Sequence, residues 1–324
     1  MSMDNVQEFS EHPDFEIQTT EARLLHASEY GKCNLLYNLL KSYEHNEEFN
    51  IDTTKNSLWT PLFMAAKQGH ADCVKLLLEA GAEVDGINKH KAAWTPLWVA
   101  TYAGHEKCVK LLLDKGAKLE VKYPETPLVV AAREGQLECL KLLIKAGANL
   151  SVKYHDGRVP IHIAVMNDFP EIARELVEAG CQVNIEDDFE CTPLLLSCFH
   201  ANEEMLEILL KAGADHSKRF YSLACVGYTA LHICASTSKR ACIEKLWEYG
   251  ADFNARTSSG SQAQEITPDD SCRKLITQLQ GTVRSLKEIC RLKIRQLLPI
   301  CQIDEVGNIY GLPQELISYL KYEH

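Results

Sequence analysis

The chain has 324 residues, a hydrophobic content of 46% and a formal net charge of −11 at pH 7. This hydrophobic content is enough to build a continuous core, whereas no apolar run is long enough to cross a bilayer, and we expect no signal peptide. We therefore expect no membrane among the partners, and because lysine and arginine form no clustered stripe, we expect no nucleic acid either.

Residues 1–21 form an acidic segment that contains six Asp and Glu residues and neither Lys nor Arg. The segment has no helical or strand periodicity, so we expect it to be flexible on its own. A solvated tail is the favoured interpretation. The alternative is an acidic arm that meets a basic partner or folds over the binding surface of the rest of the chain.

A short phrase, Thr-Pro-Leu followed by alanine, recurs along the middle of the chain. It starts at Thr60, Thr95, Thr126 and Thr192, and in altered form at Val159 and Thr229. Successive starts lie 35, 31, 33, 33 and 37 residues apart. A period near 33 with this phrase is the signature of a repeat made of a β-turn and two short helices.

Each repeat carries start and stop signals for its two helices. Threonine caps the first helix, and proline fits its first turn because no hydrogen-bond donor is lost there. The second helix follows a Gly-His pair or its equivalent, as at Gly69-His70, and ends at a Gly-Ala pair such as Gly81-Ala82. Glycine stops a helix because it adopts the left-handed conformation without Cβ strain.

The phrase, the period and the terminal glycines together resemble the ankyrin repeat family. The resemblance covers residues 22–254 and includes a degenerate first repeat around Leu24–Gly31, which makes about seven units. It implies an all-α fold, an ankyrin-repeat solenoid of helix–turn–helix units with β-hairpin loops. Such an array is in the first place a surface for binding other proteins.

The 13 cysteines are better explained by packing than by disulfides or metal. No Cys-x-x-Cys motif and no Cys/His pair at zinc-ligand spacing occurs. Four cysteines share one repeat position on the buried side of the second helix, namely Cys73, Cys108, Cys139 and Cys242. We expect His162 and His232 to bond neighbouring backbone. The sequence therefore predicts no metal and no cofactor, and a reduced protein of the cytoplasm, with the nucleus as a further possible location.

Several residues are candidates for contact with a bound protein, because aromatic residues and arginine are favoured at binding hot spots. Trp98 and Tyr102 lie on one first helix, and Arg133 occupies the matching place in the next repeat. An insertion of about four residues in the longest repeat carries Arg219, Phe220 and Tyr221. Trp59 and Trp94, which precede the phrase, are also explained by packing between adjacent hairpins.

The repeat pattern ends after Asn254. A Ser/Gly/Gln stretch follows, and Thr267-Pro268-Asp269-Asp270 then opens a helix with apolar residues at 275, 276 and 279. We expect residues 255–281 to form a linker and a capping helix, since a solenoid otherwise exposes the apolar face of its last repeat. Gly281 marks the boundary to the last segment.

The C-terminal segment places Leu286, Cys290 and Ile294 along one stripe of a helix, with Ile289 beside them. An ordinary amphipathic helix docked on the repeats would show the same stripe. After a loop, the chain continues with Leu312-Pro313, Leu316 and Tyr319-Leu320.

Residues 282–324 resemble the SOCS box, a C-terminal module that follows ankyrin repeats in the ankyrin repeat and SOCS box family. The resemblance implies that Leu286, Ile289, Cys290 and Ile294 bind elongin C, which pairs with elongin B. It also implies that Leu312, Pro313 and Leu316 bind cullin-5. One departure is that Tyr310-Gly311 stands where the family commonly has the first Leu-Pro pair, so elongin binding is the firmer expectation.

The resemblance implies the substrate-recognition subunit of an elongin B/C–cullin-5 RING E3 ubiquitin ligase, with the repeats binding the target protein. The alternative is an ankyrin scaffold with no role in ubiquitin transfer. We expect no catalysis in the chain itself, since no Gly-x-Gly-x-x-Gly or Walker sequence occurs. The sequence leaves open the identity of the target, the role of the acidic segment, the cullin affinity and the oligomeric state.

Overall fold

The computed structural model describes residues 19–43, 49–54, 59–86, 94–120, 125–222, 225–282 and 314–321, and the single residues 288, 292 and 294. The acidic segment therefore lies almost entirely outside the described residues. The chain divides into two compact units, residues 1–124 and residues 125–324, and each unit is described by itself.

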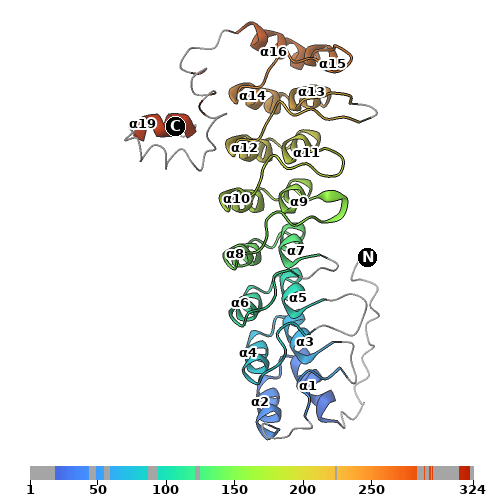
Figure 1. Ribbon diagram of the computed structural model, residues 1–324, viewed down its shortest axis with the longest axis vertical. Coiled ribbons are helices and arrows are strands. Elements are labelled where there is room, and N and C mark those ends of the chain that lie inside the picture. Colours follow the sequence, from blue (N-terminus) through green and yellow to red (C-terminus); the bar gives the residue numbers. More distant parts are fainter. Residues whose placement is uncertain are drawn as a thin grey trace. The chain divides into compact units, whose positions relative to one another are not determined.

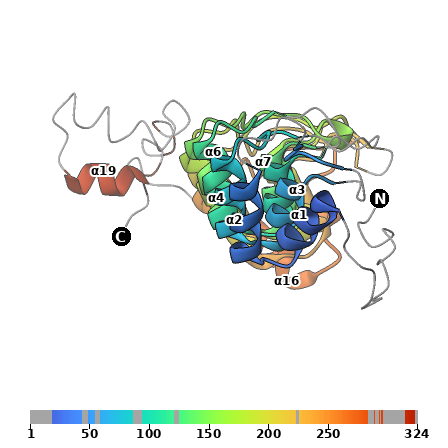
Figure 2. The same cartoon turned by 90° about the horizontal axis from the view of Figure 1, so that it is seen from below.

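Unit 1 consists of antiparallel helix pairs packed on one another (Figure 1). Its helices are α1 (Thr20–Glu29), α2 (Cys33–Ser42), α3 (Pro61–Gln68), α4 (Ala71–Glu79), α5 (Pro96–Tyr102) and α6 (Glu106–Asp114). Figure 2 shows α2 and α4 on one side of this unit and α1 and α3 on the other. The first helices of the pairs therefore form one layer and the second helices another.

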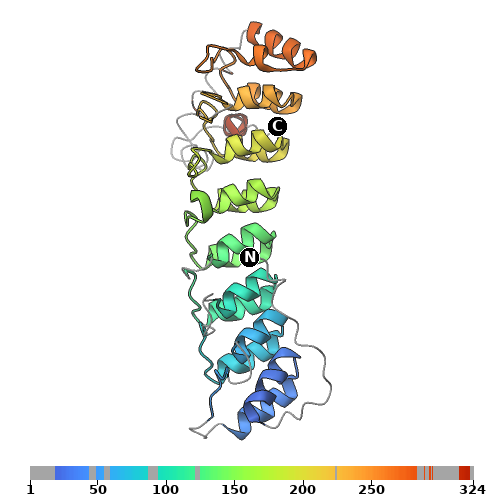
Figure 3. The ribbon, with the colours of Figure 1, turned by 90° about the vertical axis from the view of Figure 1, so that its right-hand side faces the viewer.

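Unit 2 also contains antiparallel helix pairs packed on one another. Its helices are α7 (Pro127–Glu134), α8 (Leu137–Lys145), α9 (Pro160–Met166), α10 (Pro170–Glu178), α11 (Pro193–His200), α12 (Glu203–Lys211), α13 (Ala230–Ser236), α14 (Arg240–Glu248), α15 (Ala263–Ile266), α16 (Asp270–Gly281) and α19 (Gln314–Lys321). Figure 3 shows the loops between successive pairs projecting at one edge of the stack. Within the described residues, β pairing is confined to the isolated bridges Phe220–Tyr228 and Arg256–Gln262. The all-α fold is thus confirmed.

The first helices begin where the recurring phrase predicts. The hydroxyl of Thr60 accepts a hydrogen bond from the Phe63 N–H at 3.2 Å, and Thr95, Thr126 and Thr192 cap α5, α7 and α11 in the same way. Proline follows each of these caps at the first helical position. Each cap satisfies a backbone donor that the helix itself cannot.

In the two repeats with an altered phrase, a histidine side chain accepts the backbone hydrogen bond at the start of the first helix. Nδ1 of His162 accepts from the Val159 N–H at 3.3 Å, and its Nε2 lies 3.1 Å from the carbonyl oxygen of Cys191 in the next loop. Nδ1 of His232 accepts from the Thr229 N–H at 3.3 Å. Both side chains are fully buried. The expectation that these histidines bond neighbouring backbone is confirmed.

Two of the turns between paired helices favour glycine for a reason that the phrase alone does not reveal. Gly135 has φ +73°, and a Cβ added to it would lie 2.9 Å from the Phe169 ring of the following pair. In unit 1, a Cβ on Gly69 would lie 2.6 Å from His105. A side chain here would meet both backbone strain and a ring packed against the turn.

The cysteines at the shared repeat position lie in the core. Cys73, Cys108, Cys139 and Cys242 are between 0% and 2% exposed, which confirms the expectation that they are buried.

Beyond the last repeat, the side chain of Asp269 caps α16 by accepting a hydrogen bond from the Cys272 N–H at 2.9 Å. Helix α16 buries Leu275 and Ile276 and packs on α14 and α15, so it covers the end of the array. No helix in the described part of the chain has the length and apolar character to span a bilayer.

Candidate functional site

Most of the predicted elongin and cullin residues lie outside the described part of the chain. This applies to Leu286, Ile289, Cys290, Leu312 and Pro313. The backbone is helical at residues 288, 292 and 294, and the side chain of Ile294 is half-buried. Leu316 belongs to α19, and Ile317 and Leu320 on the same helix are 3% and 4% exposed.

An aromatic stack runs through unit 1 at the predicted tryptophans. The ring of Trp59 stacks on Phe63 at 4.2 Å between centroids and on Trp94 at 5.5 Å. The stack continues from Trp94 to Trp98 at 5.2 Å and from Trp98 to Tyr102 at 5.5 Å, with all planes within 10°. Each ring thus holds its neighbours in place. Trp59 and Trp94 pack against the neighbouring repeat, in agreement with the interpretation that these two tryptophans serve packing.

The stack determines how much of Trp98 and of Tyr102 is exposed to a partner. Trp98 is only 3% exposed, whereas Tyr102 at the end of the stack is half-buried. A bound protein at this surface would therefore touch Tyr102 directly and Trp98 through its neighbours. The indole N–H groups of Trp94 and Trp98 are buried and have no acceptor among the described residues.

Arg133 in unit 2 is held by an internal ion pair. Its Nη2 lies 2.7 Å from Oε1 of Glu125 and its Nε lies 3.2 Å from Oε2, and the Glu125 side chain is 6% exposed. Burial alone would lower the pKa of Arg133, but the nearby acidic groups, Glu125 first and Glu134 after it, together outweigh burial, and the pKa is raised. The two-point contact fixes the guanidinium plane, so a partner would meet a preorganised cation that is already partly neutralised.

The inserted hairpin joins two loops and presents apolar side chains. Nη1 of Arg219 donates to the carbonyl of Gly227 at 3.0 Å and to the carbonyl of Arg256 in the next loop at 2.7 Å. Phe220 pairs with Tyr228 and meets Phe199 of α11 edge to face, with ring centroids 5.2 Å apart. Arg219 therefore anchors the hairpin.

Phe199, Phe220, Tyr221 and Val226 form what we call the hairpin patch. Tyr221 is 52% exposed, Val226 47% and Phe199 37%, while Phe220 is half-buried. Exposed apolar side chains on a hairpin and on the adjacent end of α11, beside an arginine that anchors the hairpin, have the composition of a protein-binding surface.

Reasoning from the sequence missed Phe199 and Val226. A signal for Phe199 was present, because Phe199 lies seven residues after Thr192, just as Tyr102 and Arg133 lie seven residues after Thr95 and Thr126. The three side chains thus share one repeat position at the end of the first helix. Val226 carries no comparable signal.

The described residues offer no group of three or more His, Cys, Asp or Glu side chains that could hold a metal ion. The surfaces above are built from aromatic rings, ion pairs and backbone contacts. Their chemistry is suited to recognising another protein.

Comparison with known proteins agrees with this organisation. The family described as "Ankyrin repeats (3 copies)" matches residues 24–123, 119–187 and 161–257, and the family described as "SOCS box" matches residues 282–321. The crystal structure of the human ASB11 ankyrin repeat domain is similar to the chain with a TM-score of 0.52 at 23% identity. The similarity covers 81% of this chain and 99% of that one. It supports the ankyrin fold.

Among relatives, ankyrin repeat and SOCS box protein 5 of Oryctolagus cuniculus is 29% identical over 164 residues, which are 50% of this chain and 48% of that protein. Ankyrin repeat and SOCS box protein 9 of Homo sapiens is 31% identical over 130 residues, which are 40% of this chain and 42% of that protein. The chain spans about half the length, or less, of these curated relatives. With ankyrin repeats over residues 24–257 and a SOCS box over residues 282–321, the chain belongs to the ankyrin repeat and SOCS box family.

Proposed function

We propose that the chain is the substrate-recognition subunit of an elongin B/C–cullin-5 RING E3 ubiquitin ligase. The observation that carries the proposal is the order of its parts, because a SOCS box at residues 282–321 follows an ankyrin array that ends at residue 257 and is covered by the helix α16. A plain ankyrin scaffold would need no such module. The names of the relatives, which pair the same two parts, support the same role.

In this proposal the stripe of Leu286, Cys290 and Ile294 inserts into elongin C, with Ile289 beside it. The helical backbone at residues 288, 292 and 294 supports a helix through this segment, and a helix places residues four apart on one face. Leu286 is the anchor. Truncation of a buried anchor at an interface costs about 2 kcal/mol or more, which is roughly a thirtyfold loss of affinity.

The cullin-5 contact rests on Leu312, Pro313 and Leu316, where the last belongs to α19. The buried Ile317 and Leu320 on the same helix are one turn apart, so α19 has an apolar face. Tyr310-Gly311 in place of the first Leu-Pro pair removes one apolar contact from the proposed interface. We therefore propose a weaker cullin contact than the elongin contact.

The repeats would hold the target protein while the bound ligase supplies a RING protein and a charged conjugating enzyme. The chain would perform no bond chemistry. Its contribution is to raise the effective concentration of target lysines near the enzyme. The hairpin patch is the described surface best suited to the target, because it combines three exposed apolar side chains with an anchored arginine.

Co-purification with elongins B and C tests this proposal. We expect wild type to form a soluble ternary complex and Leu286→Ala/Cys290→Ala to lose it. Glu288→Ala is the matched control, because Glu288 lies in the same segment with an exposed side chain. If the wild-type chain is folded but does not bind the elongins, the proposed receptor role is wrong, and the chain is an ankyrin scaffold with no role in ubiquitin transfer.

A further inference from the structure

Two thiols of unit 1 lie in contact although they are 40 residues apart in the sequence. Sγ of Cys33 lies 3.1 Å from Sγ of Cys73. Cys33 is the first residue of α2, and Cys73 lies in the first turn of α4. The two helices pack on each other, so the pair bridges the first and second repeats.

The two thiols differ in their access to solvent. Cys33 is half-buried, whereas Cys73 is fully buried. Unit 2 offers a useful contrast, because Cys234 interacts there with both Cys198 and Cys242, and all three are at most 1% exposed. A water-borne oxidant can therefore reach the pair in unit 1 through Cys33, while it has no such entry to the cluster in unit 2.

We propose that Cys33 and Cys73 form a redox modification site that hydrogen peroxide closes into an intramolecular disulfide. The Cys33 thiolate attacks one peroxide oxygen, which breaks the O–O bond and gives a sulfenic acid and hydroxide, and this hydroxide forms water with the proton that the Cys33 thiol released. The Cys73 sulfur then attacks the Cys33 sulfur, so that the S–S bond forms as the S–O bond breaks. The Cys73 proton and the departing hydroxide form water. In total, two thiols and one peroxide give one disulfide and two waters.

The environment of the pair fits this division of roles. Burial, together with the contact to Cys33, raises the pKa of Cys73 to about 12. Cys73 therefore keeps its proton and takes no part in the first attack. Its contact with Cys33 compensates for its low thiolate content in the second step, because a partner already in place reacts at a high effective concentration.

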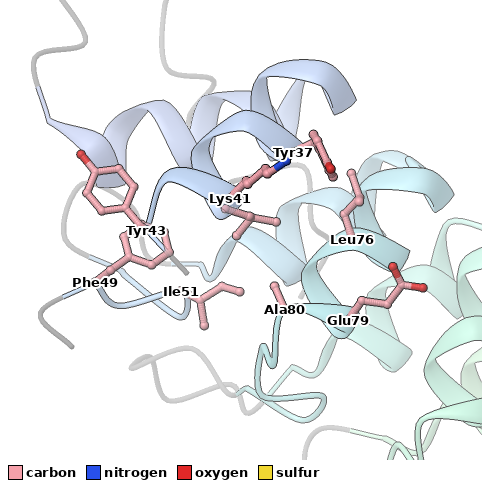
Figure 4. A pocket seen from close by; sticks show the side chains of 9 residues that line it. Tyr37, Lys41, Tyr43, Phe49, Ile51, Leu76, Glu79 and Ala80 are labelled. Carbon is pink, nitrogen blue, oxygen red and sulfur yellow. The ribbon is translucent and has the colours of Figure 1, made fainter. Parts of the chain in front are cut away.

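The disulfide would join the two helices that wall the pocket in Figure 4. This pocket of about 460 Å³ is lined in part by Tyr37, Leu40 and Lys41 of α2 and by Leu76, Glu79 and Ala80 near the end of α4. Cys33, Tyr37 and Lys41 follow one another at intervals of four along α2, and therefore lie along one stripe. A bond at one end of the two helices would fix the spacing of the pocket walls.

The test treats the folded full-length chain with hydrogen peroxide, alkylates the remaining thiols, and maps tryptic peptides by mass spectrometry. Residues 33–41 and 68–75 form separate tryptic peptides with one cysteine each. We expect them to appear as one linked species, about 2 Da lighter than the two thiol peptides together, that dithiothreitol separates. Cys33→Ser abolishes this species, and Cys108→Ser, a change at a cysteine outside the pair, retains it.

Two results would overturn the proposal. One is wild type in which Cys33 becomes oxidised while Cys73 stays an alkylatable thiol. The other is a linked species that forms only after the chain is unfolded in urea. If Cys33→Ser folds poorly, the wild-type chain still decides the matter, since oxidation without the link contradicts the proposal and a native link that raises the unfolding temperature supports it.

Discussion

Phe199 and Phe220 meet edge to face at 5.2 Å, and this contact ties the inserted hairpin to the end of α11. An edge-to-face pair contributes about 0.5–1.5 kcal/mol beyond its buried area. We expect Phe199→Ala and Phe220→Ala each to lower the free energy of unfolding and to show a coupling energy of that size in a double-mutant cycle. Urea unfolding of the two single variants and the double variant measures it. If the losses in the free energy of unfolding are strictly additive, the coupling energy is zero and the contact between the two rings contributes nothing of its own.

The exposed part of the hairpin patch is expected to act in binding and not in stability. Tyr221→Ala/Val226→Ser should leave the unfolding temperature unchanged, because both side chains are about half exposed. Quantitative mass spectrometry of co-purifying proteins should show the loss of specific partners while elongin B and C stay bound. Tyr30→Ala is the control, since Tyr30 is an exposed ring of unit 1 at 61%. An unchanged set of partners would place the target surface elsewhere.

Two glycines of unit 2 separate backbone strain from ring contact. Gly147 has φ +89° with open space around a Cβ, whereas Gly135 has φ +73° and faces the Phe169 ring at 2.9 Å. We expect Gly147→Ala to cost about 1–2 kcal/mol, the strain of a left-handed alanine. Gly135→Ala should cost clearly more, because the ring must also move. If chemical denaturation shows equal losses of the free energy of unfolding for the two variants, the Phe169 ring moves aside without an energetic penalty.

The buried histidines predict a loss of stability in acid. Burial lowers the pKa of His162 and of His232 below the ordinary value of 6.5. Below about pH 6.5 the histidines of the unfolded chain therefore bind protons that those of the folded chain do not bind. As a result, the free energy of unfolding falls as the pH falls. We expect this fall between pH 7.5 and 5.5 in denaturation curves.

The variant His162→Gln/His232→Gln should be less stable at neutral pH but should lose less on acidification. The control His155→Gln changes an exposed imidazole and should retain the wild-type slope. A double variant with the same slope as wild type would assign the acid sensitivity to other groups.

The repeats could be predicted in detail because each signal has a local cause. The cap at Thr60, the proline after it and the left-handed Gly69 all act within one turn of chain, so the residues themselves specify them. The burial of Cys73 follows from its helical position. The sequence predicts a turn between two helices at Gly135, whereas the ring that packs against this glycine belongs to the next repeat and appears only in the folded chain.

The contact surfaces were harder to predict because exposure depends on neighbours. Trp98 has the composition of a binding residue but is covered by Trp94 and Tyr102. Phe199 has a partner 21 residues away in a hairpin whose path the sequence does not specify. The contact of Cys33 with Cys73 has the same origin, since the degenerate first repeat gives no register from which to align the two helices.

Cullin-5 titrated onto the purified complex of this chain with elongins B and C measures the central claim most directly. We expect saturable binding with one cullin per complex, and a clear loss of affinity in Leu312→Ala/Pro313→Ala, while the elongins remain bound. Such a result would show that the repeat array is joined to a ubiquitin ligase scaffold. A wild-type complex that holds both elongins but shows no cullin-5 binding at any concentration would contradict the proposed receptor role.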